Sequence, residues 1–218
     1  MALARLNGNG TAKDEVTARS LLANACNTNL AVACTDYGLV LWTAKGGPQD
    51  GPGARAAYQK GCDAKSWVGC GNLGIMYQHA QGGITDYARA QSLYTLACDN
   101  KVGASCARLG RMYETGLGLA VNAPAARMLY QRGCTLMDGL GCYYLGETMR
   151  NGVGGAKDLA AARTAYADGC KNKSGASCNR IADMTAAGEG GPANAVAARP
   201  LYAKACALNV PAACAKAN

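Results

Sequence analysis

The sequence predicts an all-α solenoid, a stack of helix-turn-helix repeats that follow one another along the chain. Two observations predict it. All twelve cysteines fall into six pairs whose members stand eight positions apart, and each pair returns after 36 residues without insertion or deletion. Each copy also contains two segments with the apolar period of an α-helix. A fixed period of this length is typical of stacked supersecondary units, so we expect one continuous domain over residues 1–218.

The cysteine pairs indicate one disulfide in each repeat. An even number of cysteines at a single spacing is typical of a disulfide framework in an oxidising compartment. Closing each short loop should stabilise the fold by roughly 2–3 kcal/mol. Zinc and free thiols are the alternatives, but each repeat offers only two thiolates, whereas a structural zinc site takes four ligands. The predicted bridges are Cys26–Cys34, Cys62–Cys70, Cys98–Cys106, Cys134–Cys142, Cys170–Cys178 and Cys206–Cys214.

One helix of each copy is expected to begin at an Asx residue and to end near the first cysteine. Alanine follows the Asx residue after four positions, and leucine or tyrosine follows after eight, which is the pattern of an N-capped amphipathic helix. In the first copy this helix covers about Thr11 to Ala25, within an N-terminal cap of about residues 1–25. The Asx column is Asp14, Asp50, Asp86, Asn122, Asp158 and Asn194.

The other helix of each copy begins just before the second cysteine and carries a glycine in its middle, such as Gly74. Glycine inside a helix costs about 1 kcal/mol relative to alanine, so its recurrence predicts close contact with a neighbouring helix. The last copy is a stub over residues 211–218. We expect these helices to end in left-handed caps at the glycine column Gly46, Gly82, Gly118, Gly154 and Gly190.

Composition limits the classes of partner. The net charge of +8 is spread along the chain, which favours acidic surfaces and gives no strong case for nucleic acid. No run of about 20 apolar residues predicts a membrane span. Residues 1–10 lack the apolar region of a signal peptide. If the bridges form, we therefore expect that an export signal has been removed. We also expect a monomer.

A longer motif resembles the Sel-one-like repeat family. It runs through a Leu-Gly pair, a Gly-x-Gly turn and the Asx helix to a cysteine, as in Leu109, Gly110, Tyr113, Gly116, Gly118, Asn122, Ala126, Tyr130 and Cys134. Tetratricopeptide arrays share the layout but repeat every ~34 residues. The paired cysteines make the chain similar to the disulfide-rich branch typified by the Helicobacter cysteine-rich proteins.

The resemblance implies a right-handed superhelix whose concave face is formed by the helices that contain the second cysteines. It also implies an exported, secreted or periplasmic scaffold that binds a protein or peptide. Family members have been credited with binding or slowly hydrolysing β-lactams, and a mitochondrial relative with paired cysteines has been linked to haem.

Three columns of those helices vary from copy to copy and lie on one helix face, because their offsets are 0, 3 and 7. Their mixed chemistry suits a groove that binds a polypeptide. An acidic polypeptide would fit the positive net charge of the chain. The alternative is a neutral, solvated surface. The candidate binding residues from these columns are Asp36, Leu39, Asn72, His79, Arg108, Arg111, Tyr144 and Glu147.

Trp42 and Trp67 complete the candidate binding residues. Both replace polar or very small residues of their columns, so we expect them to be partly exposed, where tryptophan is a favoured binding anchor. Local packing beside the N-terminal cap is the alternative. The tyrosine column is assigned to packing. The arginine column could bind an anionic polymer, but the stems of such arginines more often lie across a helix; it comprises Arg19, Arg55, Arg127, Arg163 and Arg199.

Enzymatic chemistry has little support in the sequence. No serine has a lysine three residues later, so the Ser-x-x-Lys signature of penicillin-recognising enzymes is missing. We therefore expect no catalytic residue, metal or cofactor. Two alternatives stay open: weak binding or hydrolysis of a β-lactam or peptidoglycan fragment, and haem binding through His79, Met76 or Met112.

Overall fold

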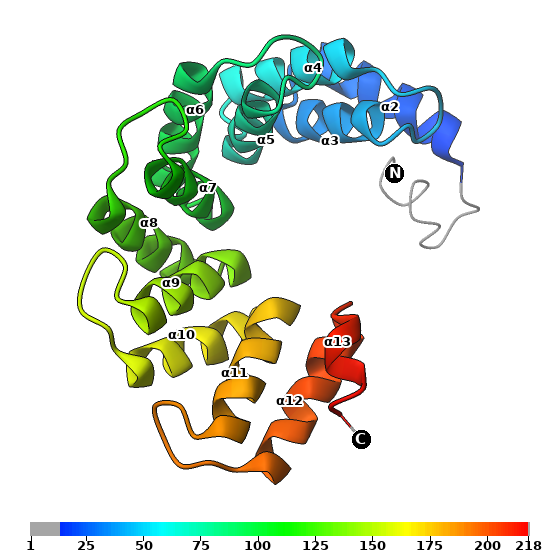
Figure 1. The fold of residues 1–218 in the computed structure, drawn as a ribbon. Coiled ribbons are helices and arrows are strands. Elements are labelled where there is room, and N and C mark those ends of the chain that lie inside the picture. The colour runs from blue at the N-terminus through cyan, green and yellow to red at the C-terminus, as the bar shows by residue number, and fades with distance from the viewer. Residues whose placement is uncertain (1–13, 218) are drawn as a thin grey trace. The chain divides into compact units, whose positions relative to one another are not determined.

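The computed structural model describes residues 14–217, and every regular element in that range is a helix (Figure 1). The chain forms two compact units, one up to Asn100 and one from Lys101. The first contains α2 (Glu15–Asn27), α3 (Ala31–Trp42), α4 (Gly51–Asp63), α5 (Trp67–Gln78) and α6 (Tyr87–Asp99). The second contains α7 (Gly103–Thr115), α8 (Ala123–Thr135), α9 (Gly139–Asn151), α10 (Leu159–Lys171), α11 (Gly175–Ala187), α12 (Ala195–Ala207) and α13 (Pro211–Cys214).

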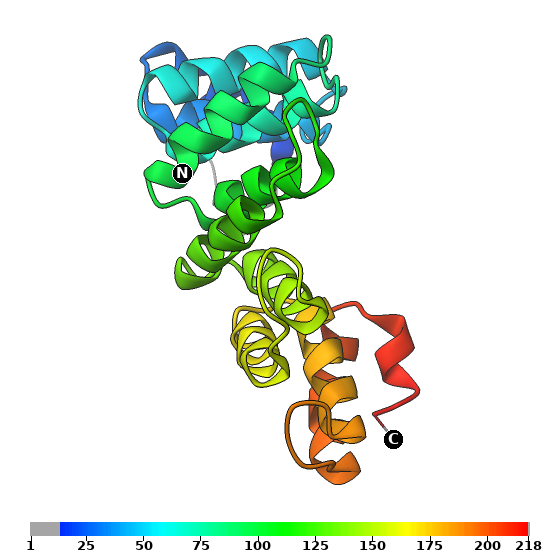
Figure 2. The ribbon, with the colours of Figure 1, turned by 60° about the vertical axis from the view of Figure 1, so that its left-hand side comes forward.

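The helices alternate between two kinds, and within each unit consecutive helices pack side by side, as Figure 1 shows for α10, α11 and α12 and Figure 2 for α10 and α11. We call α3, α5, α7, α9 and α11, which contain the second cysteine of the first five pairs, the A-type helices. The even-numbered helices are the B-type helices. The predicted all-helical solenoid is confirmed, while one continuous domain over residues 1–218 stays a prediction. Residues 1–13, where the first predicted helix was to begin, lie outside the described range.

The Asx residues cap the B-type helices as predicted. In all six, the Asx side chain accepts a hydrogen bond of 2.8–3.0 Å from the backbone N–H three residues later. Each such bond satisfies one of the N–H groups that a helix start leaves without a partner inside the helix. The cap residues therefore set where α2, α4, α6, α8, α10 and α12 begin.

The glycine in the middle of the A-type helices makes room for a tyrosine of the next B-type helix. A Cβ added to Gly74 would lie 2.8 Å from the ring of Tyr94, and one added to Gly110 would lie 2.7 Å from that of Tyr130. Real Cβ atoms do not approach carbon so closely, so the ring takes the place of the missing side chain. Tyr94 and Tyr130 are fully buried, which confirms that this column serves packing.

The predicted ends of the A-type helices are wrong by three or four residues. Helix α5 ends at Gln78, and Gly82 lies in the following loop with a φ of 70°. A Cβ on Gly82 would collide with the carbonyl oxygen of Gly51, the first residue of α4. The glycines of this column therefore adopt the left-handed conformation, as predicted, but they lie in loops and do not cap the helices. Glycine is required at Gly82 because the loop contacts the preceding B-type helix. The residues that cap the last three A-type helices in left-handed conformation are Gly116, Gly152 and Gly188.

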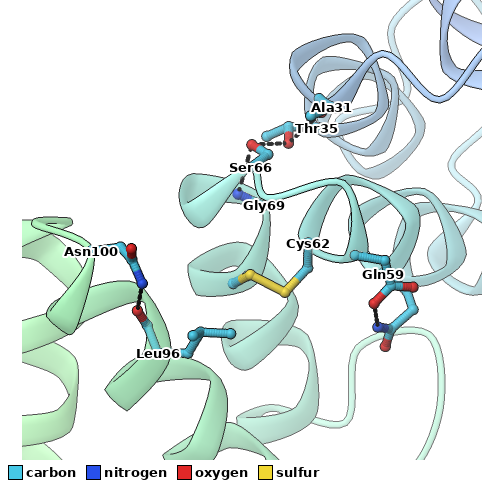
Figure 3. Close-up of a disulfide and its surroundings, with 10 residues drawn as sticks. Ala31, Thr35, Gln59, Cys62, Ser66, Gly69, Leu96 and Asn100 are labelled. Atoms are coloured by element: carbon cyan, nitrogen blue, oxygen red, sulfur yellow. Dashed lines mark hydrogen bonds between the residues drawn. A yellow bond between two sulfur atoms is a disulfide. The ribbon is translucent and has the colours of Figure 1, made fainter.

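The disulfides join the end of each B-type helix to the first turn of the next A-type helix or, for the last pair, to α13. The structure contains the bridges Cys26–Cys34, Cys62–Cys70, Cys134–Cys142, Cys170–Cys178 and Cys206–Cys214, with Cα–Cα distances of 4.3–4.8 Å, and Cys98 and Cys106 are also disulfide-bonded. Near the bridge of Cys62, Thr35 of α3 donates a 2.7 Å hydrogen bond to Ser66, the N-cap of α5 (Figure 3). This bond ties the starts of two successive A-type helices.

Side chains of the arginine column donate hydrogen bonds to backbone carbonyls of the loops. Arg19 donates to the carbonyl of Pro48, Arg55 to that of Ile84 and Arg127 to that of Ala156, in each case 29 residues further along the chain. These bonds use the guanidinium groups for structure, which is the alternative that the sequence favours. Between residues 14 and 217, no helix combines the length and apolar character needed to cross a membrane.

Candidate functional site

Three of the predicted binding residues meet around one cavity of about 220 Å³ in the second unit. Helix α7 contributes Arg111, and α9 contributes Tyr144 and Glu147. Each stands on the exposed face of its helix, because the columns share that face. The residues that complete the lining were not among the predicted binding residues: Glu114, Tyr143, Thr148, Asn151 and Val153.

Aromatic rings form one wall of the cavity. The rings of Tyr143 and Tyr144 lie 5.4 Å apart, edge to face, and Tyr144 lies 5.1 Å from buried Tyr130. The guanidinium of Arg111 stands 4.8 Å from the centre of the Tyr144 ring, within the range of a cation–π interaction. Tyr144 is thus held between a buried ring and a cation, which leaves the wall little freedom to rearrange.

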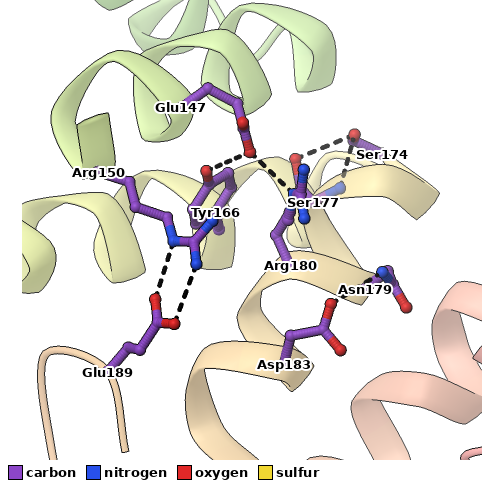
Figure 4. A network of polar contacts seen from close by, with 9 residues as sticks. All are labelled: Glu147, Arg150, Tyr166, Ser174, Ser177, Asn179, Arg180, Asp183 and Glu189. Atoms are coloured by element: carbon purple, nitrogen blue, oxygen red, sulfur yellow. Dashed lines mark hydrogen bonds and ion pairs between the residues drawn. The ribbon is translucent and has the colours of Figure 1, made fainter. Parts of the chain in front are cut away.

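The two carboxylates of the cavity are already hydrogen-bonded. Glu114 accepts from the hydroxyl of Tyr130 at 2.9 Å. Glu147 accepts from the hydroxyl of Tyr166 at 2.5 Å and pairs with Arg180 at 2.9 Å (Figure 4). Burial, together with the bond to a carboxylate and its charge, raises the pKa of both tyrosines well above the usual value of 10. Both tyrosines are therefore neutral donors throughout the physiological range.

These bonds belong to a wider pattern in the tyrosine column. The hydroxyls of Tyr94 and Tyr130 bond to Gln78 and Glu114, 16 residues earlier. Those of Tyr166 and Tyr202 bond to residues 19 earlier, Glu147 and Asp183. The acceptor thus moves by one helical turn, which keeps it on the same helix face. The sequence carried this signal, since a polar acceptor occupies one position or the other in each of these copies.

A bidentate ion pair closes the network at the end of α9. Arg150 donates to both carboxylate oxygens of Glu189 at 2.8 and 3.0 Å, which ties α9 to the loop before α12 (Figure 4). The hydrogen bond from Arg150 lowers the pKa of Glu189. The network therefore extends from the cavity into the next repeat of the second unit.

The other candidates lie outside the cavity. Asn72 is half-buried on α5, and half-buried Trp67 begins that helix, while exposed His79 caps its end. Arg108 is half-buried on α7, and its positive charge opposes the rise in the pKa of Asp138 that burial causes.

Helix α3 carries three of the candidates in the first unit. Asp36 and Trp42 are half-buried, and Leu39 is 45% exposed. The Trp42 ring packs against the cluster that includes Leu41 and Tyr58. Burial and the nearby charge of Asp36 raise the pKa of Tyr58 to about 12. Half-burial agrees with the partial exposure expected for both tryptophans.

Between residues 14 and 217, no group of three or more His, Cys, Asp or Glu side chains is placed to hold a metal ion. Met76 and Met112, the methionines considered for haem, are 2% and 1% exposed. Their thioethers are enclosed by the helix packing, so neither reaches a ligand at the surface.

The Sel1 repeat model matches residues 1–28, 68–102, 103–136, 139–164 and 175–210, more than half of the chain. The chain belongs to the Sel1 repeat family. Among solved structures, it is similar to a Sel1 repeat protein from Oxalobacter formigenes, with a TM-score of 0.85, 22% identity, and coverage of 97% of this chain and 85% of that one. No match was found among curated proteins.

Two further structures resemble this Sel1 repeat chain. One is c5321, a protective antigen of uropathogenic Escherichia coli strains with an SLR fold, with a TM-score of 0.78 and 23% identity over 94% of this chain. The chain spans only 44% of the length of that antigen. The other is the Helicobacter pylori cysteine-rich protein B, with a TM-score of 0.50 and 26% identity over 59% of this chain and 92% of that one. The first likeness shows the fold, and the second agrees with the disulfide-rich repeat.

Proposed function

We propose that this Sel1 repeat chain is an exported scaffold that binds a polypeptide segment along the exposed face of its A-type helices. Sel1 repeats generally mediate interactions between proteins, so the family points to a protein partner. The disulfides indicate an oxidising compartment, which supports a secreted or periplasmic location.

The observation that carries the proposal is the cavity where Arg111, Tyr144 and Glu147 meet. Its volume of about 220 Å³ is smaller than the roughly 300–1,000 Å³ of sites for cofactors and drug-sized ligands. A cavity of this size suits one side chain of a longer segment. Tyrosine and arginine, together with tryptophan, are enriched among the residues that dominate binding interfaces. Here the two contact each other before a ligand arrives, which lowers the entropic cost of binding.

Peptides selected by phage display against the immobilised chain, with its disulfides intact, test the proposal. We expect Tyr144→Ala to weaken the selected peptides at least tenfold, because the wall of the cavity is lost. Tyr87→Ala is the matched control, since Tyr87 is 37% exposed at the start of α6, and it should leave binding unchanged. Urea unfolding of both variants separates lost contacts from lost structure.

Equal binding by the two variants would contradict the assignment of the cavity. A chromogenic β-lactam serves as a second measurement on the same preparations. Turnover above background that disappears in Glu147→Gln would replace the scaffold by the hydrolase alternative.

A further inference from the structure

Tyr58 departs from the pattern of the other tyrosines in its column. Counted back from Tyr58, the positions that hold the acceptor in the four later copies are Trp42, 16 residues earlier, and Leu39, 19 residues earlier. Neither side chain can accept a hydrogen bond. Within residues 14–217 the Tyr58 hydroxyl makes no hydrogen bond, although Tyr58 as a whole is only 4% exposed.

Asp36, one turn before Leu39 on α3, is a carboxylate without a paired cation among the described residues. Burial raises its pKa, and no neighbouring positive charge opposes that rise. The Tyr58 ring lies against α3 two residues beyond Asp36, since a Cβ added to Gly38 would lie 2.7 Å from that ring. The charge of Asp36 also raises the pKa of Tyr58. By contrast, the following carboxylates of the second unit each pair with a cation: Glu114 with Arg111, Glu147 with Arg180, Asp183 with Lys216 and Glu189 with Arg150.

The remaining surface at this place is apolar and aromatic. Leu39 is 45% exposed, and the Trp42 ring is half-buried against the cluster around Tyr58. Packing fixes the ring, so little entropy is lost when a ligand covers it. A carboxylate and a hydroxyl without internal hydrogen-bond partners thus lie on α3 and α4, beside a half-buried aromatic ring.

We propose that Asp36, Leu39, Trp42 and Tyr58 form a recognition site for an arginine side chain of a protein partner. A guanidinium offers five N–H donors in a planar fork, enough to bond the Asp36 carboxylate and the Tyr58 hydroxyl oxygen together. The arginine stem covers Leu39, and the guanidinium plane lies against the indole. The net charge of +8 repels basic partners in general, so this attraction is local.

The site is distinct from the cavity on α7 and α9, and it depends on the proposed function only in taking the ligand to be part of a polypeptide. Lysine fits less well, because its ammonium is a compact, strongly hydrated point charge without a planar fork. The site therefore discriminates between the two basic side chains.

Nuclear magnetic resonance titration of the ¹⁵N-labelled full chain with N-acetyl-arginine amide tests the site. We expect saturable shifts at the amides of Asp36 and Leu39 and at the indole N–H of Trp42. N-acetyl-citrulline amide, which has nearly the same shape without the charge, should bind at least tenfold more weakly. The lysine analogue should bind between the two. Equal affinity for arginine and citrulline, or shifts only elsewhere, would overturn the proposal.

Two variants sharpen the test. Asp36→Asn keeps the size of the side chain and should weaken the arginine probe at least tenfold, whereas Tyr58→Phe should weaken it about threefold. Asp63→Asn is the control, since Asp63 is exposed on α4 and accepts a hydrogen bond from Gln59. It removes one negative charge and should leave the affinity unchanged.

An unchanged affinity in Asp36→Asn would overturn the proposal, and so would an equal loss in Asp63→Asn, which would show general charge attraction. Tyr144→Ala should bind the arginine probe as the wild type does. That result separates this site from the cavity, so that either proposal can fail alone.

Discussion

The exposed faces of the A-type helices carry the same columns in both units but satisfy their polar groups differently. In the second unit, Glu147 takes bonds from Tyr166 and Arg180. In the first unit, Asp36 has no cation and Tyr58 no acceptor within the described range. The comparison teaches that the fold needs the packing of each tyrosine ring against the glycine of an A-type helix. It does not need a hydrogen bond from the hydroxyl of that tyrosine. Where the internal bonds are missing, the same polar groups become free for a ligand.

The largest difference between the units is expected in the stability lost when one of their carboxylates is removed. Glu147→Ala should lower the free energy of unfolding by about 2–3 kcal/mol, because it leaves the Tyr166 hydroxyl and Arg180 without their partner. Asp36→Ala should change it by about 0.5 kcal/mol or less, since no bond is lost. Urea unfolding under non-reducing conditions measures both. Similar losses in the two variants would show that Asp36 is paired after all.

A smaller difference is expected in the stability lost when a tyrosine hydroxyl is removed. Tyr166→Phe should cost about 1 kcal/mol, the net value of a typical hydrogen bond, whereas Tyr58→Phe should be close to neutral. The ring and its packing against the glycine are kept in both variants, so each serves as the control for the other. A loss in Tyr58→Phe as large as that in Tyr166→Phe would contradict the comparison.

The smallest effect is the dependence of stability on pH, and its sign differs between the units. Burial raises the pKa of Asp36 above its ordinary value of 3.8, so the folded state holds this proton more tightly than the unfolded state. Ionised Asp36 therefore destabilises the fold above its raised pKa, and the penalty disappears as the pH falls through that pKa to below 3.8.

Glu189 behaves in the opposite way. Its pKa lies below the ordinary 4.5 because of Arg150, so its contribution is present above pH 4.5 and is lost as the pH falls through the lowered pKa. In thermal unfolding at pH 7, Asp36→Asn should be slightly more stable than the wild type and Glu189→Gln slightly less, each by about 0.5 kcal/mol. Both differences should shrink towards pH 3. The same sign for both variants at pH 7 would count against the assignment.

The features that recur with the period were predictable from the sequence. The cysteine pairs, the Asx caps and the close helix contact at Gly74 follow from local rules that apply to each copy, whereas Tyr94 as the residue that makes this contact comes from the structure. The position of the helix ends was not predictable in this way, because Gly82 is required by a loop contact with Gly51, which belongs to the preceding B-type helix. A left-handed glycine looks the same in sequence at a helix end and inside a loop.

The candidate site was predicted in part. Column variation led to Arg111, Tyr144 and Glu147, which do meet, because helical spacing fixes the face on which a residue stands. Glu114 was missed because its role depends on the reach of a tyrosine from another helix, which spacing alone does not determine. Trp42 stood out in the sequence because it differs from the other residues of its column. The structure adds that Trp42 occupies the position from which Gln78 accepts the hydrogen bond of Tyr94, so Tyr58 lacks an acceptor there.

The hydroxyl of the tyrosine column can bond to an acceptor at either of two positions, so each repeat needs a polar residue at only one of them. A copy can lose its acceptor at one of them and regain it at the other, as Gln78 and Glu147 illustrate. The side chain at the vacated place is then free to diversify over generations without unfolding the hairpin beneath it.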